Sequence, residues 1–328
     1  MKILIVNTGI IPVKLYGGTE RVIWCLGKEL VKLGHHVTYL VKKGSTCNFA
    51  SVLIIDEQKD IIDQIPNDID LVHFNFNPAK INDLKKPYLI TIHGNANNSN
   101  ALNLNTVFVS KNHAERFGSQ SYVHNGLDWD EYMQPDLLKE RKYFHFLGNA
   151  AWRIKNVRGA IELINNTKCE KLWVLGGVRF NFNMGMRFTF SPRIKFCGMV
   201  GGEQKDRLLN GSKGLIFPVR WHEPFGLAII ESLFYGCPVF GTPYGSLPEI
   251  VNNDVGFLSY KKDEVLNAML YNKYDARHCN DYAVEEFNSK KMALAYLAKY
   301  EKILAGEKLN KSAPVLKHIQ ETKFLPWE

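Results

Sequence analysis

The sequence predicts an α/β protein made of two doubly wound parallel sheets, one in each half of the chain. Short runs of β-branched and other apolar residues alternate with helix-length segments along the 328 residues. The runs are continuously apolar, which is typical of strands buried on both faces of a parallel sheet. The length, the 45% hydrophobic share and the 23% charged share suit a globular protein with two domains.

The first half begins with a predicted strand at 2–7, KILIVN, followed by a helix at 19–34. Apolar residues recur at helical spacing in that helix, which stops at Gly34. The later apolar runs predict strands at 36–41, 51–56, 70–75, 87–93 and 106–110.

The second half repeats this alternation after a polar, proline-containing segment at 127–142. We therefore predict one domain over 1–140 and a second over 141–304. A helix at 289–304 would carry the chain back toward the first half, where the tail 305–328 would pack. Two such sheets facing each other leave a cleft at the carboxyl ends of their strands, where ligands of open α/β sheets bind. The elements expected in this half are strands at 143–148, 172–177, 193–198, 214–219 and 237–242, and helices at 156–166, 203–211 and 224–236.

Composition limits where the protein acts. No run approaches the roughly 18 apolar residues that a membrane span requires. The N-terminus MKILIVNTGIIPV has no extended basic region and no small-residue cleavage site, so it fits a buried strand better than a signal peptide. These features predict a cytoplasmic protein, with the inner face of the membrane as an alternative location. The six cysteines form no CxxC pair, which favours reduced thiols over a zinc site or disulfides.

The formal net charge of +8 predicts an anionic partner, such as a nucleoside diphosphate, an acidic lipid surface or a nucleic acid. No run of five or more Lys or Arg occurs, so a nucleic-acid-binding tail is not indicated. A dinucleotide-binding oxidoreductase is also disfavoured, because NTGIIPVKLYGG does not match the Gly-x-Gly-x-x-Gly pattern expected after the first strand.

The stretch VRWHEPFGLAIIESLFYGCPVFG (219–241) carries the strongest functional signal. A helix is predicted from Pro224 or Phe225 to about Tyr235, since proline suits a first helical turn. The start of such a helix binds phosphate through its free N–H groups and its dipole. The amides expected at this start are those of Phe225, Gly226 and Leu227.

Two carboxylates accompany this helix start. Glu223 precedes it, and Glu231 lies inside the helix, roughly 7–8 Å further along the axis. The arrangement offers one carboxylate to a sugar, amides to a diphosphate and a second carboxylate to ribose hydroxyls. The alternative is an ordinary helix-start acid at Glu223 and a solvated helix residue at Glu231.

Five segments, in the same order along the chain, resemble those of the retaining GT-B glycosyltransferases of the Glu-x7-Glu type (family 4-like, group 1). HEPFGLAIIESLFYGCPVFGTPYGSLPEIV (222–251) resembles the segment that gives the type its name, and its end, GSLPEIV (245–251), resembles the part that closes the donor pocket. The resemblance covers nearly the whole chain. The other three segments are YGGTERVIWCLGKELVKLGHHVTYL (16–40), TIHGN (91–95) and VFVSKNHAERFG…YVHNGLDWDEY (107–132).

The resemblance implies a GT-B fold, with two Rossmann-like domains facing across a cleft, and roles for residues of the second domain. Glu223 would sit beside the donor sugar, and Glu231 would accept hydrogen bonds from the ribose hydroxyls. The other donor contacts implied are the amides of Phe225, Gly226 and Leu227 for the distal phosphate, and the backbone of Met199 and Val200 for the nucleobase.

The resemblance also assigns residues of the first domain. Gly17 and Gly18 would open a loop near the diphosphate and the acceptor, and His93 would contact the transferred sugar. For a histidine that follows a strand, a packed and hydrogen-bonded side chain is the ordinary alternative.

Cations are needed where a nucleoside diphosphate leaves, because it carries about two to three negative charges. The resemblance assigns this task to Lys155, together with Arg153. The family commonly has Gly-Arg at the preceding strand end, whereas Asn149 stands at that position here, so Arg153 would restore the charge from a shifted position. No Asp-x-Asp pair suits a divalent cation at a strand end, so we expect no metal or other cofactor.

The segment VRFNFNMGMRFTF (178–190) interleaves Arg179 and Arg187 with four phenylalanines. Such interleaving can stack the bases of a single-stranded nucleic acid. An apolar hairpin or lid with solvated basic residues is the ordinary alternative, and contact with an acceptor or another subunit is a third.

Together these features predict a retaining hexosyltransferase that uses a nucleotide-sugar donor, with UDP favoured. Its acceptor would be a glycan, a lipid-linked molecule or a small molecule; peripheral membrane contact is a further expectation, and no nucleic-acid partner is expected. The alternatives are a related sugar phosphorylase or nucleotide-sugar epimerase, and a nucleotide-sugar-binding sensor without turnover.

Overall fold

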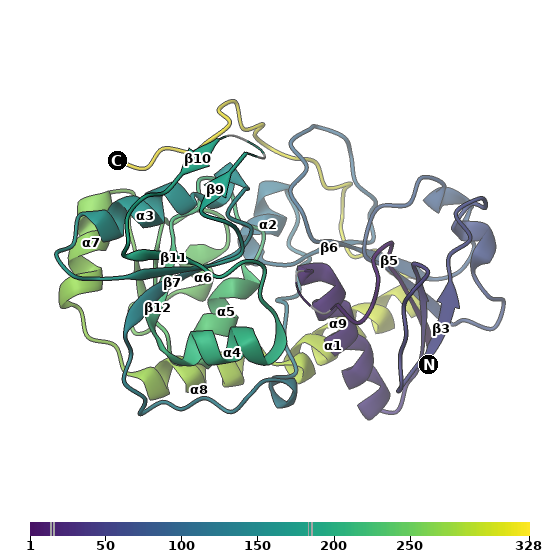
Figure 1. Ribbon diagram of the computed structural model, residues 1–328. Helices are drawn as coiled ribbons and strands as arrows, with labels where there is room; N and C mark the ends of the chain where they lie inside the picture. Colours follow the sequence, from purple (N-terminus) through teal and green to yellow (C-terminus); the bar gives the residue numbers. More distant parts are fainter. Residues whose placement is uncertain (14, 16, 183, 185) are drawn as a thin grey trace. The chain divides into compact units, whose positions relative to one another are not determined.

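The computed structural model describes residues 1–13, 15, 17–182, 184 and 186–328, which form two α/β units (Figure 1). The first unit comprises Met1–Val13, Gly17–Asp128 and Phe287–Ile319, and the second mainly Trp129–Glu286 and Gln320–Glu328. Each contains one six-stranded sheet with parallel pairing. The predicted α/β class with two doubly wound sheets is therefore confirmed. Tyr16, the first residue of the segment 16–40, lies outside the described residues.

The first sheet has the strand order β3-β2-β1-β4-β5-β6, and α1 (Gly18–Lys32) connects β1 to β2. The apolar side chains of α1 that recur at helical spacing are buried, as the sequence predicts. A short helix, α2 (Lys111–Arg116), follows β6 and begins at Ser110, whose side chain accepts the His113 N–H. The strands are β1 (Lys2–Val6), β2 (His36–Val41), β3 (Ser51–Ile54), β4 (Leu71–Phe74), β5 (Tyr88–Ile92) and β6 (Thr106–Phe108), with 3-10 turns η1 (Ile62–Gln64) and η2 (Ile81–Asp83).

The long helix α9 (Ser289–Leu304) belongs to the first unit, where it packs on α1 and β5. Its Tyr300 hydroxyl lies 2.8 Å from Nδ1 of His73 in β4. This grouping differs from the predicted ranges, which placed 289–304 in the second domain. The predicted tail 305–328 also belongs to both units. Its residues up to Ile319 are part of the first unit, and Gln320–Glu328 are part of the second.

The second sheet has the order β11-β8-β7-β12-β13-β14. Its core lies between the sheet and the helices α3 and α7, and Trp327 of the tail is part of it. The strands are β7 (Tyr143–Leu147), β8 (Leu172–Leu175), β11 (Ile194–Phe196), β12 (Ser212–Phe217), β13 (Val239–Gly241) and β14 (Gly256–Leu258). The helices are α3 (Val157–Asn165), α4 (Gly202–Asn210), α5 (Leu227–Phe234), α6 (Leu247–Ile250), α7 (Lys262–Tyr271) and α8 (Ala276–Glu286), with 3-10 turns η3 (Trp129–Glu131) and η4 (Arg153–Lys155).

Several elements of the second unit were not predicted. β14, α7 and α8 complete the unit after the stretch that resembles the glycosyltransferases, and α6 lies at the end of that stretch. Residues 178–190 contain a small antiparallel hairpin, β9 (Phe180–Asn181) and β10 (Arg187–Phe188), as the hairpin alternative expected. The expectation that its basic residues are solvated is wrong, because Arg187 is buried and Arg179 donates to the Thr189 carbonyl at 2.8 Å. Residues 183 and 185 of this segment lie outside the described residues.

A buried histidine in β7 makes the second unit sensitive to acid. His145 is fully buried, with Nδ1 2.6 Å from Ser212 Oγ and Nε2 2.8 Å from Ser232 Oγ. Burial lowers the pKa of His145 from 6.5 to about 3, so the folded protein keeps the ring neutral where the unfolded chain protonates it.

We therefore expect this residue to lower the free energy of unfolding by about 1.4 kcal/mol for each pH unit below about 6.5, down to the folded pKa. The sign follows because only the unfolded state binds the proton in this window. His145→Gln keeps hydrogen-bonding groups but does not titrate, so it should remove that slope. Urea unfolding at about pH 7 and pH 5 measures both proteins, and equal pH dependence would contradict the assignment.

All six cysteines are free thiols, three of them buried. Within the described ranges, no helix combines the length and the apolar character needed to cross a bilayer.

Candidate functional site

Glu223 lies in the loop after β12 and is held in a buried ion pair. Its Oε2 accepts hydrogen bonds from Lys155 Nζ at 2.5 Å and from Trp221 Nε1 at 2.8 Å. Glu223 is 6% exposed and Lys155 8%. The lysine ammonium also lies 5.3 Å from the ring centre of Phe217 and 5.0 Å from that of Trp221. The pair therefore sits in an aromatic pocket where charge interactions are strong.

The parallel sheet explains why these two residues meet. Lys155 ends η4, which follows β7, and Glu223 follows β12. β7 and β12 are hydrogen-bonded neighbours, so the loops at their carboxyl ends lie together. The structure thus brings together two of the predicted catalytic residues, which are 68 positions apart in the sequence.

A backbone clamp from the segment 245–251 fixes the Glu223 loop. The Ser246 N–H donates to the Glu223 carbonyl at 2.9 Å, and Ser246 Oγ donates to the Phe225 carbonyl at 2.7 Å. Gly245 has a φ of +68°, and a Cβ there would lie 2.2 Å from the Glu223 nitrogen. Only glycine fits this close approach.

We expect Gly245→Ala to lower the free energy of unfolding by more than about 2 kcal/mol and to weaken ligand binding at Glu223, because the loop must move. Gly202→Ala is the matched control, since Gly202 also has a positive φ of +50° but open space around it. The control should lose only about 1–2 kcal/mol. Thermal unfolding of both variants measures the difference, and equal losses would contradict the clamp.

The helix after Glu223 starts later than predicted. α5 begins at Leu227, because Gly226 adopts a left-handed conformation with a φ of +88°. The prediction of a start at Pro224 or Phe225 is therefore wrong, and of the three predicted amides only that of Leu227 belongs to the helix. The first-turn N–H groups are those of Leu227 and Ala228, which have no acceptor within the helix, and both residues are partly exposed. The N–H groups of this first turn, rather than those of Phe225 and Gly226, are suited to bind an anion.

Glu231 is buried, so the alternative of a solvated helix residue is wrong. It is 3% exposed and forms an ion pair with Lys205 of α4, which is 4% exposed. Its Oε1 also accepts the Tyr132 hydroxyl at 2.8 Å, and the lysine ammonium lies 5.0 Å from the Tyr132 ring centre. The second unit therefore has two buried Lys–Glu pairs, one before α5 and one within it.

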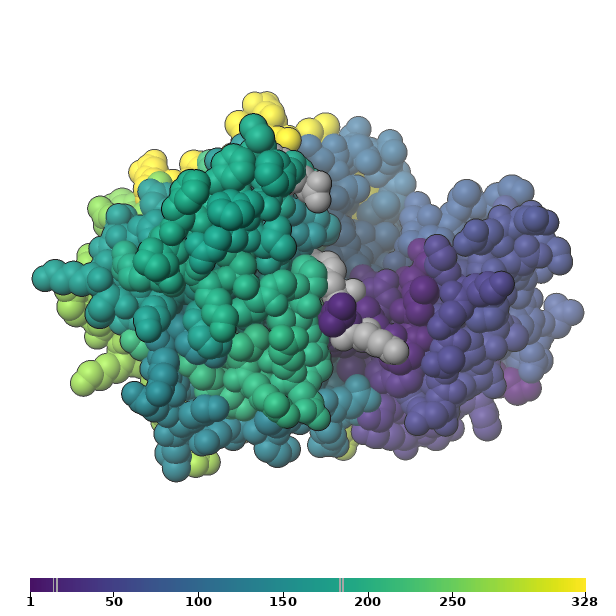
Figure 2. Space-filling view, in the orientation of Figure 1, coloured from purple at the N-terminus to yellow at the C-terminus, as the bar shows by residue number. Residues whose placement is uncertain are grey.

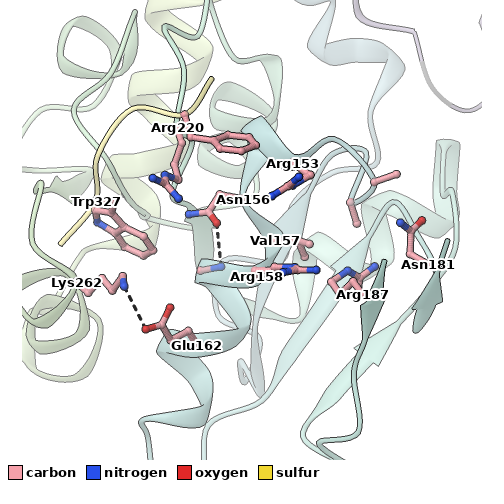
Figure 3. A pocket seen from close by; sticks show the side chains of 14 residues that line it. Arg153, Asn156, Val157, Arg158, Glu162, Asn181, Arg187, Arg220, Lys262 and Trp327 are labelled. Carbon is pink, nitrogen blue, oxygen red and sulfur yellow. Dashed lines mark hydrogen bonds and ion pairs between the residues drawn. The ribbon is translucent and has the colours of Figure 1, made fainter. Parts of the chain in front are cut away.

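Arg153 lies apart from the Lys155–Glu223 pair. Its guanidinium stacks 4.8 Å from the ring centre of Phe324, in the C-terminal tail. It lines a cavity of about 230 Å³ whose lining residues do not include Lys155 or Glu223 (Figure 3). We call this the arginine cavity; its cationic lining residues are Arg153, Arg158, Arg187, Arg220 and Lys262. Asn149, at the position of the family's arginine, accepts the Ala151 N–H at 3.0 Å and shapes the turn before η4.

Met199 and Val200 lie in the loop between β11 and α4. Met199 is 39% exposed, whereas Val200 is buried. The loop turns at Gly198, which has a φ of +72°. Their role toward a nucleobase stays a prediction.

The three predicted residues of the first unit lie at the carboxyl ends of β1 and β5. Gly17 caps α1, and Gly18 is the first residue of the helix. A Cβ at Gly17 would lie 2.8 Å from Glu20 Oε2 and 2.8 Å from Val13 Cγ2, both side-chain atoms. His93 follows β5; its Nε2 lies 2.9 Å from Asn75 Oδ1, and desolvation lowers its pKa to about 4. The imidazole is therefore neutral at neutral pH.

Comparison with known proteins shows what the second unit is similar to. Residues 141–271 match the family described as glycosyl transferases group 1. The match lies within the second unit and makes that unit similar to the group 1 glycosyl transferases. A protein from Klebsiella pneumoniae, described as an uncharacterized 41.2 kDa protein in the cps region, is 28% identical over 116 residues. That alignment spans 33% of this chain and 32% of the relative, about a third of each.

Solved structures extend the likeness to both units. AviGT4, a glycosyltransferase involved in avilamycin A biosynthesis, is 20% identical, with a TM-score of 0.74 over 93% of this chain and 98% of its own. HepE from Anabaena, solved in complex with UDP and glucose, is 15% identical, with a TM-score of 0.66 over 92% of this chain and 99% of its own. At such identities the likeness establishes the GT-B fold that the resemblance implied.

Several residues around the candidate site were not predicted. Lys205, Tyr132 and Trp221 contact the two glutamates through their side chains, and Ser246 through its backbone. Trp221, Tyr132 and Ser246 lay inside segments that the sequence singled out. Lys205 gave no signal, since it is one of several charged residues on a predicted helix.

Proposed function

We propose that the chain is a retaining glycosyltransferase that moves a hexose-type sugar from a nucleoside diphosphate to an acceptor. The observation that carries this proposal is the buried Lys155–Glu223 pair beside the free first turn of α5. It lies at the carboxyl edge of a parallel sheet, within the residues that match the group 1 family.

Lys155 and the first turn of α5 are suited to stabilise the leaving group. When the bond between the sugar C1 and the phosphate oxygen breaks, negative charge develops on the diphosphate. An ammonium in a buried, aromatic pocket and two helix-start amides stabilise that charge strongly. We assign the diphosphate to Lys155, Leu227 and Ala228, and not to Arg153, which stacks on Phe324.

No protein nucleophile is assigned. We propose that the acceptor hydroxyl attacks C1 on the face that the diphosphate leaves, and that its proton passes to the leaving phosphate oxygen. The new C1–O bond then lies on the same face as the old one. Glu223, beside the sugar, would orient its hydroxyls and hold Lys155 in place.

The remaining donor contacts are assigned to the residues that the resemblance implies. Glu231, held by Lys205 and Tyr132, would accept ribose hydroxyls, and the backbone at Met199 and Val200 would meet the base. UDP is favoured; among the structural neighbours, HepE was solved with UDP and glucose, and starch synthase IV from Arabidopsis thaliana with ADP and acarbose. His93, Gly17 and Gly18 would contact the sugar, the diphosphate and the acceptor, which we propose to be a saccharide, a lipid-linked or a small molecule.

A thermal-shift screen tests the donor. A ligand that binds only the folded state raises the free energy of unfolding by about 2.7 kcal/mol at a hundred times its Kd. We expect UDP and its hexose conjugates to stabilise the protein more than GDP or ADP compounds do.

The anomeric configuration of the product tests the mechanism: retention is expected, and inversion contradicts it. Turnover that needs free phosphate, or epimerisation of the donor alone, would indicate the phosphorylase or epimerase instead.

Metal independence is part of the proposal. Among the residues that the structure describes, no group of three or more His, Cys, Asp or Glu side chains is placed to hold a metal ion. Lys155 supplies the positive charge that a divalent cation would otherwise supply. We therefore expect the initial rate of transfer to be unchanged after dialysis against EDTA, and a loss that Mg²⁺ or Mn²⁺ restores would contradict this.

A further inference from the structure

The segment 178–190 has an unusual pattern, with an apolar residue at every second position. The sequence VRFNFNMGMRFTF places Val, Phe or Met at each even number and Arg, Asn, Gly or Thr at each odd one. Period-two alternation is typical of strands with one apolar and one polar face. In a hairpin on the surface of a soluble protein, the apolar face normally points inward.

In the structure this polarity is inverted. Phe180 pairs with Phe188, and Asn181 with Arg187, so each pair shares one face of the hairpin. Asn181, Arg187 and Thr189 are buried, at 5–7% exposure. The even-numbered side chains face outward, and we call them the apolar face: Val178, Phe180, Phe182, Met184, Met186, Phe188 and Phe190, which are 47–80% exposed.

The phenylalanines of the apolar face form one cluster. The Phe182 and Phe188 ring centres are 5.6 Å apart, and Phe180 lies 5.9 Å from Phe190 and 6.1 Å from Phe188. The teal surface of the space-filling view includes this segment on the second unit (Figure 2). An exposed apolar cluster of this kind marks an interaction surface rather than an ordinary exposed side chain.

The polar face of the same hairpin lines the arginine cavity. Asn181 and Arg187 belong to its wall, beside Arg158 (Figure 3). Arg158 Nη2 donates to the Met186 carbonyl, which fixes the hairpin over the start of α3. Among the described lining residues, Glu162 is the single carboxylate, and it is paired with Lys262 at 3.2 Å.

The cavity also holds an unsatisfied donor. Trp327 is 7% exposed and lines the cavity, and its indole N–H has no hydrogen-bond partner among the described residues. Five cationic side chains against one carboxylate, with a free N–H, favour an anion with several oxygens, such as a phosphate group.

We propose that the hairpin docks the chain on an anionic bilayer, with the apolar face in the boundary between headgroups and acyl chains and a lipid phosphate in the arginine cavity. Outward-facing phenylalanine and methionine side chains suit that boundary, and the cations of the arginine cavity attract anionic lipids. The net charge of +8 acts in the same direction. The inference does not depend on the proposed function, because it uses neither Lys155 nor Glu223.

Flotation of the full chain with vesicles tests the docking. We expect the wild-type protein to float with phosphatidylcholine vesicles that contain phosphatidylglycerol, and weakly with phosphatidylcholine alone. Phe182→Ser/Phe190→Ser should lower the partition coefficient at least about tenfold, since two rings leave the apolar boundary. The matched control is Leu138→Ser, which removes a 94% exposed side chain elsewhere in the unit and should change nothing.

The cavity has its own test. Arg158→Gln should weaken binding to the anionic vesicles about fivefold, whereas Arg158→Lys keeps the charge and should bind nearly as well. The inference is overturned if the wild-type protein does not float, if the double serine variant floats as well as wild type, or if phosphatidylglycerol makes no difference. It is also overturned if the apolar face proves to join two copies, with a wild-type dimer in light scattering that the double variant abolishes.

Discussion

Glu223→Gln is expected to lower kcat by about three orders of magnitude, the scale seen when one preorganised charge contact is removed from an active site. The side-chain amide oxygen of the new glutamine can still accept the hydrogen bond from Trp221 Nε1, but the negative charge that holds Lys155 in its aromatic pocket is lost. The lysine then remains buried without a counter-charge, so the free energy of unfolding should also fall, by about 3 kcal/mol. Initial rates with a UDP-hexose and urea unfolding measure the two effects.

The control for this variant is Glu203→Gln. Glu203 is paired with Arg207 on the surface of α4, where both side chains are more than 70% exposed. Such pairs contribute little, so the control should keep both rate and stability. A Glu223→Gln enzyme with a rate within tenfold of wild type would remove Glu223 from the mechanism, and a nucleotide-sugar sensor would then become the better account.

The second large effect is expected for Lys205→Met. This change leaves Glu231 buried beside Tyr132 without its cation, and breaking a buried pair in this way costs about 3–5 kcal/mol of unfolding free energy. Replacing both partners, in Lys205→Met/Glu231→Leu, should recover most of that loss, because an apolar pair needs no desolvation of charge. Urea unfolding of the single and double variants measures this.

The double variant also separates a structural role from a binding role. If Glu231 accepts the ribose hydroxyls, the restored protein should still bind UDP at least about tenfold more weakly than wild type, since hydrogen bonds to a charged group are lost. Calorimetric titration with UDP decides this. Wild-type affinity in a stable double variant would make the Lys205–Glu231 pair purely structural.

Much of the fold could be predicted because the sheets are parallel. Strands such as β7 and β12 are buried along most of their length, and each contains a short apolar run, although β7 includes His145 and β12 begins with Ser212 and Lys213. β14 is only Gly256–Leu258, too short for such a run to stand out, and α7 and α8 have few buried residues. The start of α5 was misplaced because proline suits a first turn, while the left-handed Gly226 depends on the loop that Gly245 and Ser246 hold.

The candidate site was predictable where one local segment carries it. Glu223 and Glu231 stand out within a single stretch, but their lysine partners come from other elements. Lys155 and Arg153 show the limit most clearly: they are two residues apart in a 3-10 turn, which turns their side chains about 120° apart. One meets Glu223 and the other meets Phe324. Likewise, the alternation in 178–190 was visible, but which face points outward depends on the polar cavity beneath it.

A crystal structure of the complex with a UDP-hexose tests the central claim most directly. We expect the distal phosphate on the amides of Leu227 and Ala228, within hydrogen-bonding distance of Lys155 Nζ, and the ribose hydroxyls on the Glu231 carboxylate. A nucleotide seated in the arginine cavity beside Arg158 and Trp327, with the Lys155–Glu223 pair untouched, would contradict the account.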